Sequence, residues 1–106
     1  MSLAQTPDPP YYAVIFTSTL ASDDGYGAMA EKMVELASQQ PGFLGIESAR
    51  EDGGLGITVS YWTDEAAIAA WKENAKHQTA QKLGNERWYR DFQLRVAKVE
   101  RDYGKS

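Results

Sequence analysis

The residues best suited to chemistry are concentrated in one part of this 106-residue chain. Its three tryptophans and its single histidine all lie between Trp62 and Tyr89. Tryptophan buries a large apolar area and carries one N–H that needs a partner, and histidine is the side chain whose ordinary pKa lies near neutrality. A chemical site in this protein would therefore draw much of its wall from this stretch, although the residues do not name a reaction.

A helix is predicted through the middle of that stretch, from about Asp64 to Leu83. On a helical projection, the side that turns toward a sheet carries apolar residues, namely Ala67, Ile68, Trp71 and Ala75. The side that turns toward water is charged, with Glu65, Lys72, Glu73 and Lys76. Between them runs an uncharged strip made of Ala70, Asn74, His77 and Gln81. Such a strip suits the lip of a pocket, because it offers hydrogen bonds at a modest desolvation cost.

These positions define the candidate site. His77 would act as an acid or base toward a bound substrate. Asn74 or Arg95 would stabilise negative charge that develops during a reaction. The substrate-binding wall would be aromatic, formed by Phe16, Trp71, Trp88 and Tyr89.

The same residues also have structural interpretations. Trp71 would then belong to the core, and His77 would be a partly exposed helix residue. Arg95 would form a salt bridge with Glu47. Trp62, at the end of a predicted strand, would lie at a seam between subunits. These alternatives stay open at the level of the sequence.

Composition excludes several classes of function. The net charge is −4 and basic residues form no long run, which disfavours nucleic acid and anionic membranes as partners. One histidine and no cysteine disfavour a conventional zinc site and exclude disulfides, so we expect no metal and a cytoplasmic location. No apolar run is long enough to span a membrane. Glycine-rich nucleotide motifs and a nucleophile elbow are missing as well.

The order of apolar segments predicts the fold. Strands are expected at Tyr11–Leu20, at Phe43–Arg50, at Leu55–Trp62, and from Tyr89 to about Val99. A first helix follows capping side chains at 22–24 and ends before Pro41-Gly42. This β-α-β-β-α-β order is that of an α+β, ferredoxin-like fold with an antiparallel sheet. We expect residues 1–10 to form a flexible leader, 11–103 the domain, and 104–106 a tail.

Both faces of the predicted sheet are apolar, whereas two helices cover only one. A second copy of the chain is the simplest cover for the other face. The sequence therefore predicts a homodimer.

Three segments resemble the antibiotic biosynthesis monooxygenase (ABM) domain. The first is Ser60–Ile68 (SYWTDEAAI), followed by Trp71 and His77. The second is the Pro-Gly-Phe turn within residues 40–45, and the third is Trp88-Tyr89 with residues 95–101. The resemblance spans roughly residues 11–103. It implies a dimeric α+β barrel in which the sheets of two subunits pack face to face.

The resemblance also implies an activity. The family includes cofactor-independent oxygenases that convert polycyclic phenols to quinones, and Trp71 and His77 have the spacing of two pocket residues in those members. Ala67 stands where they carry an asparagine, and Gln81 stands where haem-degrading members carry their histidine. We therefore expect a monooxygenase that needs no cofactor and acts on a small aromatic phenol. The alternatives are a non-catalytic dimeric ligand-binding module and a haem-binding or haem-degrading relative.

Overall fold

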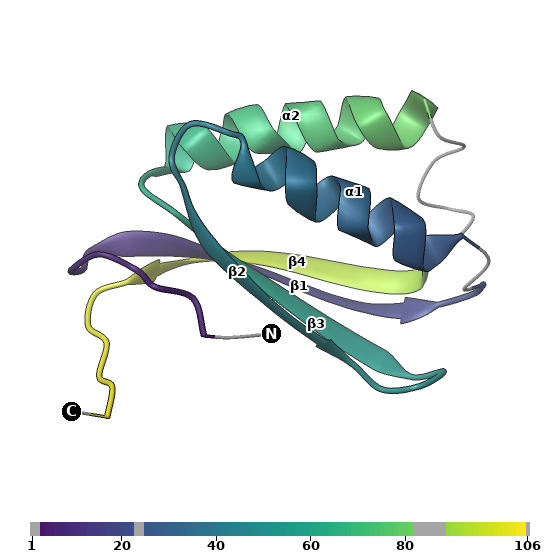
Figure 1. The fold of residues 1–106 in the computed structure, drawn as a ribbon, viewed down its shortest axis with the longest axis horizontal. Helices are drawn as coiled ribbons and strands as arrows, with labels where there is room; N and C mark the ends of the chain where they lie inside the picture. Colours follow the sequence, from purple (N-terminus) through teal and green to yellow (C-terminus); the bar gives the residue numbers. More distant parts are fainter. Residues whose placement is uncertain (1–2, 23–24, 82–88, 106) are drawn as a thin grey trace.

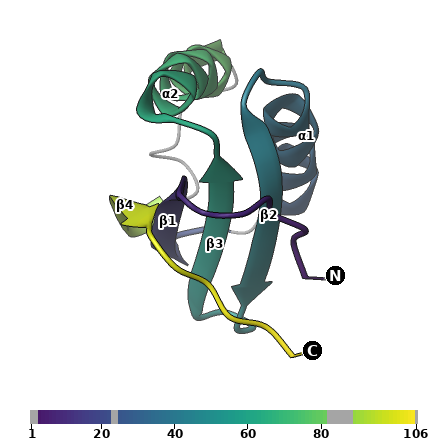
Figure 2. The same cartoon turned by 90° about the vertical axis from the view of Figure 1, so that its left-hand side faces the viewer.

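The computed structural model describes residues 3–22, 25–81 and 89–105, with the backbone alone for 76–81. Its elements follow the predicted order (Figure 1): β1 Tyr11–Leu20, α1 Tyr26–Ser38, β2 Phe43–Arg50, β3 Leu55–Trp62, α2 Glu65–Gln81 and β4 Tyr89–Val99. The sheet is antiparallel, with strand order β2-β3-β1-β4. Both helices lie on one side of it (Figure 2). The predicted ferredoxin-like α+β fold is confirmed.

The two faces of the sheet can be assigned from β1, its central strand. Residues Tyr12, Val14, Phe16 and Ser18 form the face beneath the helices, called here the helix face, because Val14 packs in the core. The alternate residues, from Tyr11 to Thr19, form the other side, called here the open face. Directly opposed residues of neighbouring strands share a face, so the register assigns every strand.

Short polar and glycine signals determine where the helices begin and end. Asp64 caps α2, since its Oδ1 accepts the backbone N–H of Ala67 at 2.8 Å. For α1, Gly25 occupies the N-cap position in a left-handed conformation (φ 76°) where a capping side chain from residues 22–24 was expected, and among the described residues no side-chain hydrogen bond is made at that cap. Asp23 and Asp24 themselves lie outside the described residues. After α1, Gly42 (φ 86°) turns the chain, and its carbonyl accepts the N–H of Thr63 at 2.9 Å.

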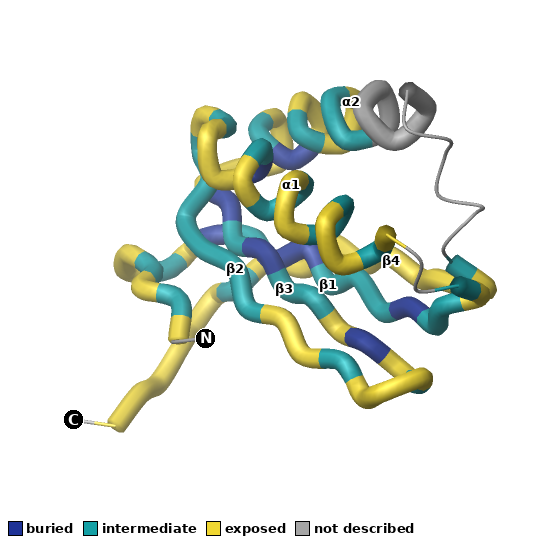
Figure 3. Tube along the Cα trace, turned by 45° about the vertical axis from the view of Figure 1, so that its right-hand side comes forward, coloured by how far each residue is buried: buried dark blue, intermediate teal, exposed yellow. Residues whose placement is uncertain are grey.

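The core lies between the helices and the end of the sheet where β3 stops. Trp62 is fully buried there, and its indole N–H donates to Ser60 Oγ at 2.9 Å. Phe43 packs edge-on against Trp62, and Trp71 stacks on it at 6.2 Å. The expectation that Trp62 lies at a seam between subunits is therefore wrong, because the helices of its own chain cover it. Buried positions follow β1 and β3, whereas most of β4 is exposed (Figure 3).

The terminal segments cross one end of the open face. The backbone N–H of Ala4 donates to Glu47, which also accepts the hydroxyl of Tyr61 at 2.7 Å. Tyr11 is buried at this end, and its hydroxyl donates to Asp102. Glu47 lies on β2, and two strands, β3 and β1, separate it from Arg95 on β4, so the salt bridge considered for that pair does not form. Glu47 instead anchors the leader.

No helix in the described part of the chain is long and apolar enough to cross a membrane.

Candidate functional site

An aromatic cluster lies on the helix face, at the end of the molecule where α1 and β4 begin. It comprises residues from three elements, namely Phe16, Tyr26, Tyr89 and Phe92. The Phe16 ring meets Tyr89 edge-on at 5.2 Å and lies 5.5 Å from Phe92, measured between centroids. Tyr26 meets Tyr89 at 5.7 Å. Edge-to-face pairs at these distances hold one another in defined orientations, so the cluster forms a firm apolar wall.

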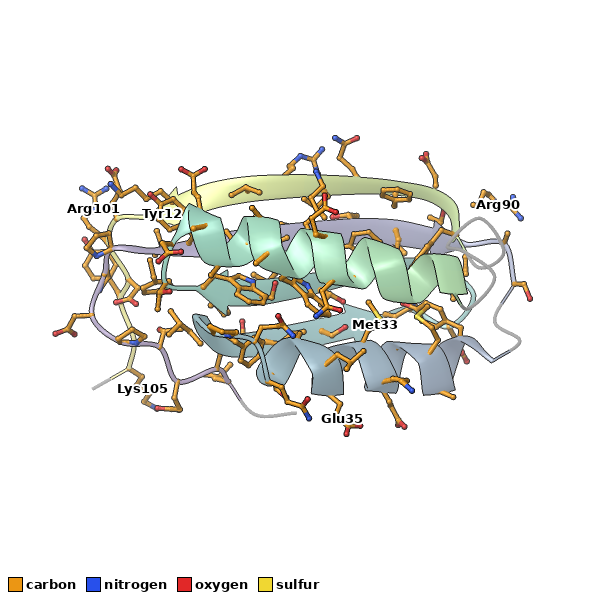
Figure 4. All side chains as sticks on the ribbon, turned by 90° about the horizontal axis from the view of Figure 1, so that it is seen from above. Tyr12, Met33, Glu35, Arg90, Arg101 and Lys105 are labelled. Atoms are coloured by element: carbon orange, nitrogen blue, oxygen red, sulfur yellow. The ribbon has the colours of Figure 1, made fainter. Side chains whose placement is uncertain are left out.

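This wall continues as an exposed apolar row along β4. Phe92, Leu94 and Val96 all lie on the helix face, opposite Ser18, Phe16 and Val14. Their exposed fractions are 46%, 40% and 46%. Seen from the helix side, β4 runs along the edge of the sheet outside both helices (Figure 4). An apolar row left open beside an aromatic cluster is the kind of surface that takes an apolar ligand.

Arg50, at the end of β2, ties the cluster to the sheet. Its guanidinium reaches across β3 to β1, where it donates to the backbone oxygen of Ser18 at 3.2 Å and to the hydroxyl of the same residue. A further N–H donates to the Tyr26 hydroxyl at 3.4 Å, and the guanidinium carbon lies 5.3 Å from the Tyr26 ring centre. The planar group therefore fixes Tyr26 by a hydrogen bond and a cation–π contact together.

Gly56 makes this path possible. A Cβ at Gly56 would lie 2.2 Å from the guanidinium carbon of Arg50, so no other residue fits without moving the arginine. Neither residue was singled out from the sequence as part of a site. The available signal was a glycine inside a strand, which often marks a close approach of another group.

Two phenol hydroxyls meet within the cluster. Tyr89 donates to the oxygen of Tyr26 at 3.5 Å. Burial, helped by this hydrogen bond, raises the pKa of Tyr89 well above its usual range, against the opposing effect of Arg50. Tyr89 therefore remains a neutral phenol that can donate at physiological pH.

The structure brings together some of the predicted site residues. Phe16 and Tyr89 contact each other in the cluster, as expected for two wall residues. Trp71 lies toward the other end of the helix face, stacked on Trp62, and is half-buried. Asn74 follows one turn later and is also half-buried. From there α2 runs toward the end that holds the cluster (Figure 1).

Of the other predicted positions, one does not join this group and two cannot be placed. Arg95 pairs with Ile15 and so lies on the open face, on the opposite side of the sheet from Trp71 and Asn74. Within one chain, Arg95 therefore does not share a pocket with them. The His77 side chain and the whole of Trp88 lie outside the described residues. The described residues include no cluster of three or more carboxylate or imidazole side chains that could hold a metal ion.

The arrangement combines an aromatic and aliphatic wall with a small polar group at one end. Such a combination of a mostly apolar surface with a few converging polar groups is typical of a small-molecule site.

Comparison with known proteins gives the family. The antibiotic biosynthesis monooxygenase model matches residues 16–83, from β1 to the end of α2. A Bacillus subtilis protein, Uncharacterized protein YqjZ, is 55% identical over 100 residues, covering 93% of this chain and 88% of that protein. Jasmonate monooxygenase ABM of Pyricularia oryzae is 30% identical over 94 residues. That match covers 83% of this chain but 43% of the fungal protein, so the chain spans less than half of that relative.

Solved structures share the fold at low sequence identity. SnoaB of Streptomyces nogalater, a cofactor-independent oxygenase, superposes with a TM-score of 0.72 at 14% identity, over 92% of this chain and 100% of SnoaB. PA3566 of Pseudomonas aeruginosa superposes with a TM-score of 0.68 at 20% identity, over 92% and 99% of the two chains. These likenesses concern the fold alone. The family match over most of the domain shows that this chain belongs to the antibiotic biosynthesis monooxygenase family.

Proposed function

We propose that this protein is a cofactor-independent monooxygenase that oxidises a small phenolic aromatic compound. The observation that carries the proposal is the aromatic cluster with its exposed continuation along β4, on the face where the helices lie. Apolar side chains that stay exposed to water in the ligand-free protein are unfavourable. A flat apolar ligand that covers them would gain the free energy of burying that surface. The family membership and the fungal relative named as a monooxygenase support the reaction class.

The proposed reaction converts a phenol to a quinone. The phenolic C–OH becomes a carbonyl, and a ring C–H becomes a second carbonyl with one atom of dioxygen. The other oxygen atom leaves as water with the two hydrogens lost from the ring and the hydroxyl. The substrate thus supplies all four electrons, and no external reductant is needed. The protein has to bind the phenol, promote its ionisation and stabilise the negative charge that develops.

Each remaining candidate residue has a role in this scheme. Phe16 and Tyr89 form the apolar wall, and Trp71 extends it toward the core. His77 accepts the phenolic proton, and Asn74 donates a hydrogen bond to the developing charge. Arg95, on the open face, takes no part within its own subunit.

The test is turnover by the purified protein. Naphthols and hydroxyanthracenes would be offered in air-saturated buffer, with oxygen uptake followed by electrode and quinone formation by absorbance. We expect one oxygen molecule to be consumed for each quinone formed.

His77→Ala should lower kcat by on the order of 100-fold, the usual contribution of a positioned base. Phe92→Ser should raise KM by removing part of the wall, whereas Tyr103→Ser, at an exposed residue beyond the end of β4, should change neither constant. Unchanged kcat in His77→Ala would remove histidine from the mechanism, and no oxygen uptake with any phenol would reject the activity.

We also propose that the protein works as a homodimer joined through the open faces. Leu55 and Ile57, on the open face of β3, have exposed fractions of 48% and 43%. Together with Ala49 they line a shallow hollow near the β2–β3 turn. The terminal segments cover the other end of this face, so the free apolar part is the area that a second copy would bury.

A further inference from the structure

We infer that Tyr26 is a ligand-binding residue whose hydroxyl donates a hydrogen bond to an oxyanion on the bound aromatic compound. This inference deepens the proposed function, because it names the ionised, phenolate form as the species that the site holds. It also adds a contact from α1, an element that the sequence did not place in the site.

The hydrogen bonds around Tyr26 carry the argument. A phenol hydroxyl has one proton to donate and can accept two hydrogen bonds. The Tyr26 oxygen accepts one from Tyr89 at 3.5 Å and one from Arg50 at 3.4 Å. Both accepting positions are thus occupied, so the proton of Tyr26 must point to a third group. Tyr26 is the acceptor in both of these bonds, and neither of them uses its own proton.

The direction of these bonds is set by the donors. Arg50 has no accepting atom, so it can act toward Tyr26 only as a donor. Tyr89 is a neutral phenol held at the edge of the Tyr26 ring, and its hydroxyl points to the same oxygen. A hydroxyl that accepts from a cation becomes a stronger donor, because the charge draws electron density from its O–H bond. Tyr26 is therefore prepared to donate.

The charge of Arg50 favours an anion over a neutral oxygen at this point. The guanidinium lies over the Tyr26 ring and donates a hydrogen bond to the Tyr26 hydroxyl, which is the group that would contact the oxyanion. It is held in place by two backbone oxygens and the Ser18 hydroxyl, none of which carries a negative charge to cancel it. A phenolate whose ring lies on Phe92 and whose oxygen meets Tyr26 would gain both the apolar contact and a charge-assisted hydrogen bond.

The experiment compares two probes of nearly equal size, 4-nitrophenol and 4-nitroanisole. The first ionises and the second, its methyl ether, does not. Binding to the purified full-length protein is measured by calorimetry, and ionisation of bound 4-nitrophenol is read from its visible absorbance. We expect the wild-type protein to bind 4-nitrophenolate more tightly than 4-nitroanisole and to lower the apparent pKa of the bound phenol.

Tyr26→Phe keeps the ring and removes only the hydroxyl. It should weaken 4-nitrophenolate about tenfold, the usual effect of one hydrogen bond to a charged group, and raise the pKa of the bound phenol by about one unit. It should leave 4-nitroanisole within twofold. Tyr12→Phe is the matched control, because Tyr12 lies on the helix face at the other end of β1 (Figure 4) and should change neither probe. Circular dichroism confirms that each variant is folded.

The outcomes separate this inference from the proposed activity. If Tyr26→Phe weakens both probes equally, or neither, or if the wild-type protein binds neither probe at millimolar concentration, the assignment of Tyr26 is overturned. If 4-nitrophenolate binding depends on Tyr26 while no phenol is oxidised, the oxyanion site stands and the proposed oxygenase activity fails. If phenols are oxidised with unchanged kcat/KM in Tyr26→Phe and no probe responds, the activity stands and this inference fails.

Discussion

At the scale of single residues, the candidate site depends on a glycine whose missing side chain lets an arginine cross the neighbouring strand. Arg50 reaches Ser18 and Tyr26 only because Gly56 leaves the space above β3 empty. The arginine thus links β2 to β1 and to the first residue of α1. Its role here is to position Tyr26, and its geometry depends on a glycine that carries no chemistry of its own.

This dependence can be tested by substitution of glycine. Gly56→Ala should lower the free energy of unfolding by about 1–3 kcal/mol, because a Cβ there displaces the guanidinium and breaks its hydrogen bonds. Gly27→Ala is the matched control. A Cβ at Gly27, inside α1, meets nothing within 4 Å, so this variant should be more stable by about 0.5–1 kcal/mol. Urea denaturation measures both. Equal effects of the two substitutions would mean that Arg50 is not held over Gly56.

A second residue-scale prediction concerns the pair Tyr61 and Glu47 on the open face. Burial, together with the bond to Glu47, raises the pKa of Tyr61 from 10.0 to about 12. At a pH between these two pKa values, Tyr61 therefore keeps its proton in the folded protein and loses it in the unfolded chain. Stability from this group is complete below pH 10 and is lost as the pH rises toward 12. Tyr61→Phe should flatten the fall in stability over this interval, measured by urea denaturation at a series of pH values. An equally steep fall in the variant would contradict the assignment.

At the scale of elements, short patterns in the sequence predict most of the positions where helices and strands begin and end. Strand bounds and the β2–β3 hairpin agree with the alternation of apolar residues and the glycine turn between them. The end of α1 before Pro41-Gly42 and the start of α2 at Asp64 also agree. The start of α1 does not, because Gly25 turns the chain before the helix begins. Serine and aspartate side chains near the start of a helix can form several different hydrogen bonds to the backbone. The path of the backbone decides which of these bonds forms.

The capping of α2 gives the prediction at this scale. Asp64→Ala should lower the free energy of unfolding by about 1 kcal/mol, because the N–H of Ala67 loses its acceptor. Asp64→Ser retains a capping oxygen and should retain most of the stability. Thermal unfolding followed by circular dichroism compares the three proteins. A serine variant as unstable as the alanine variant would show that the cap contributes little.

At the scale of the whole molecule, the two faces of one sheet form two different surfaces. The helix face carries the core at one end and the aromatic cluster at the other. The open face is covered by the terminal segments at one end and leaves Leu55 and Ile57 exposed at the other. Arg95 belongs to the second surface and Tyr89 to the first, although they lie six positions apart on one strand, because the pairing of β4 with β1 shifts register between Thr19 and Leu20. The register alone decides this division.

The proposed homodimer leads to the prediction at this scale. Ile57→Lys places a charge in the middle of the free apolar area, so it should convert a dimer to a monomer at micromolar concentration. Gln39→Lys adds the same charge at an exposed position after α1 and should leave the dimer intact. Sedimentation velocity distinguishes the two masses. A wild-type protein that sediments as a stable monomer would reject the dimer, and so would an Ile57→Lys variant that remains dimeric.

The amino-acid sequence alone predicts the order of the elements, the bounds of the strands and the aromatic residues of the candidate site. Hydrophobic periodicity is local, and the resemblance carried by residues 60–77 is local too. Tertiary structure alone decided that Trp62 is core, that Arg95 faces away from Trp71, and that Arg50 crosses Gly56 to hold Tyr26. Each of these depends on which strands become neighbours and in which register. Pairing between distant segments is a property of the folded chain, and no spacing along the sequence records it.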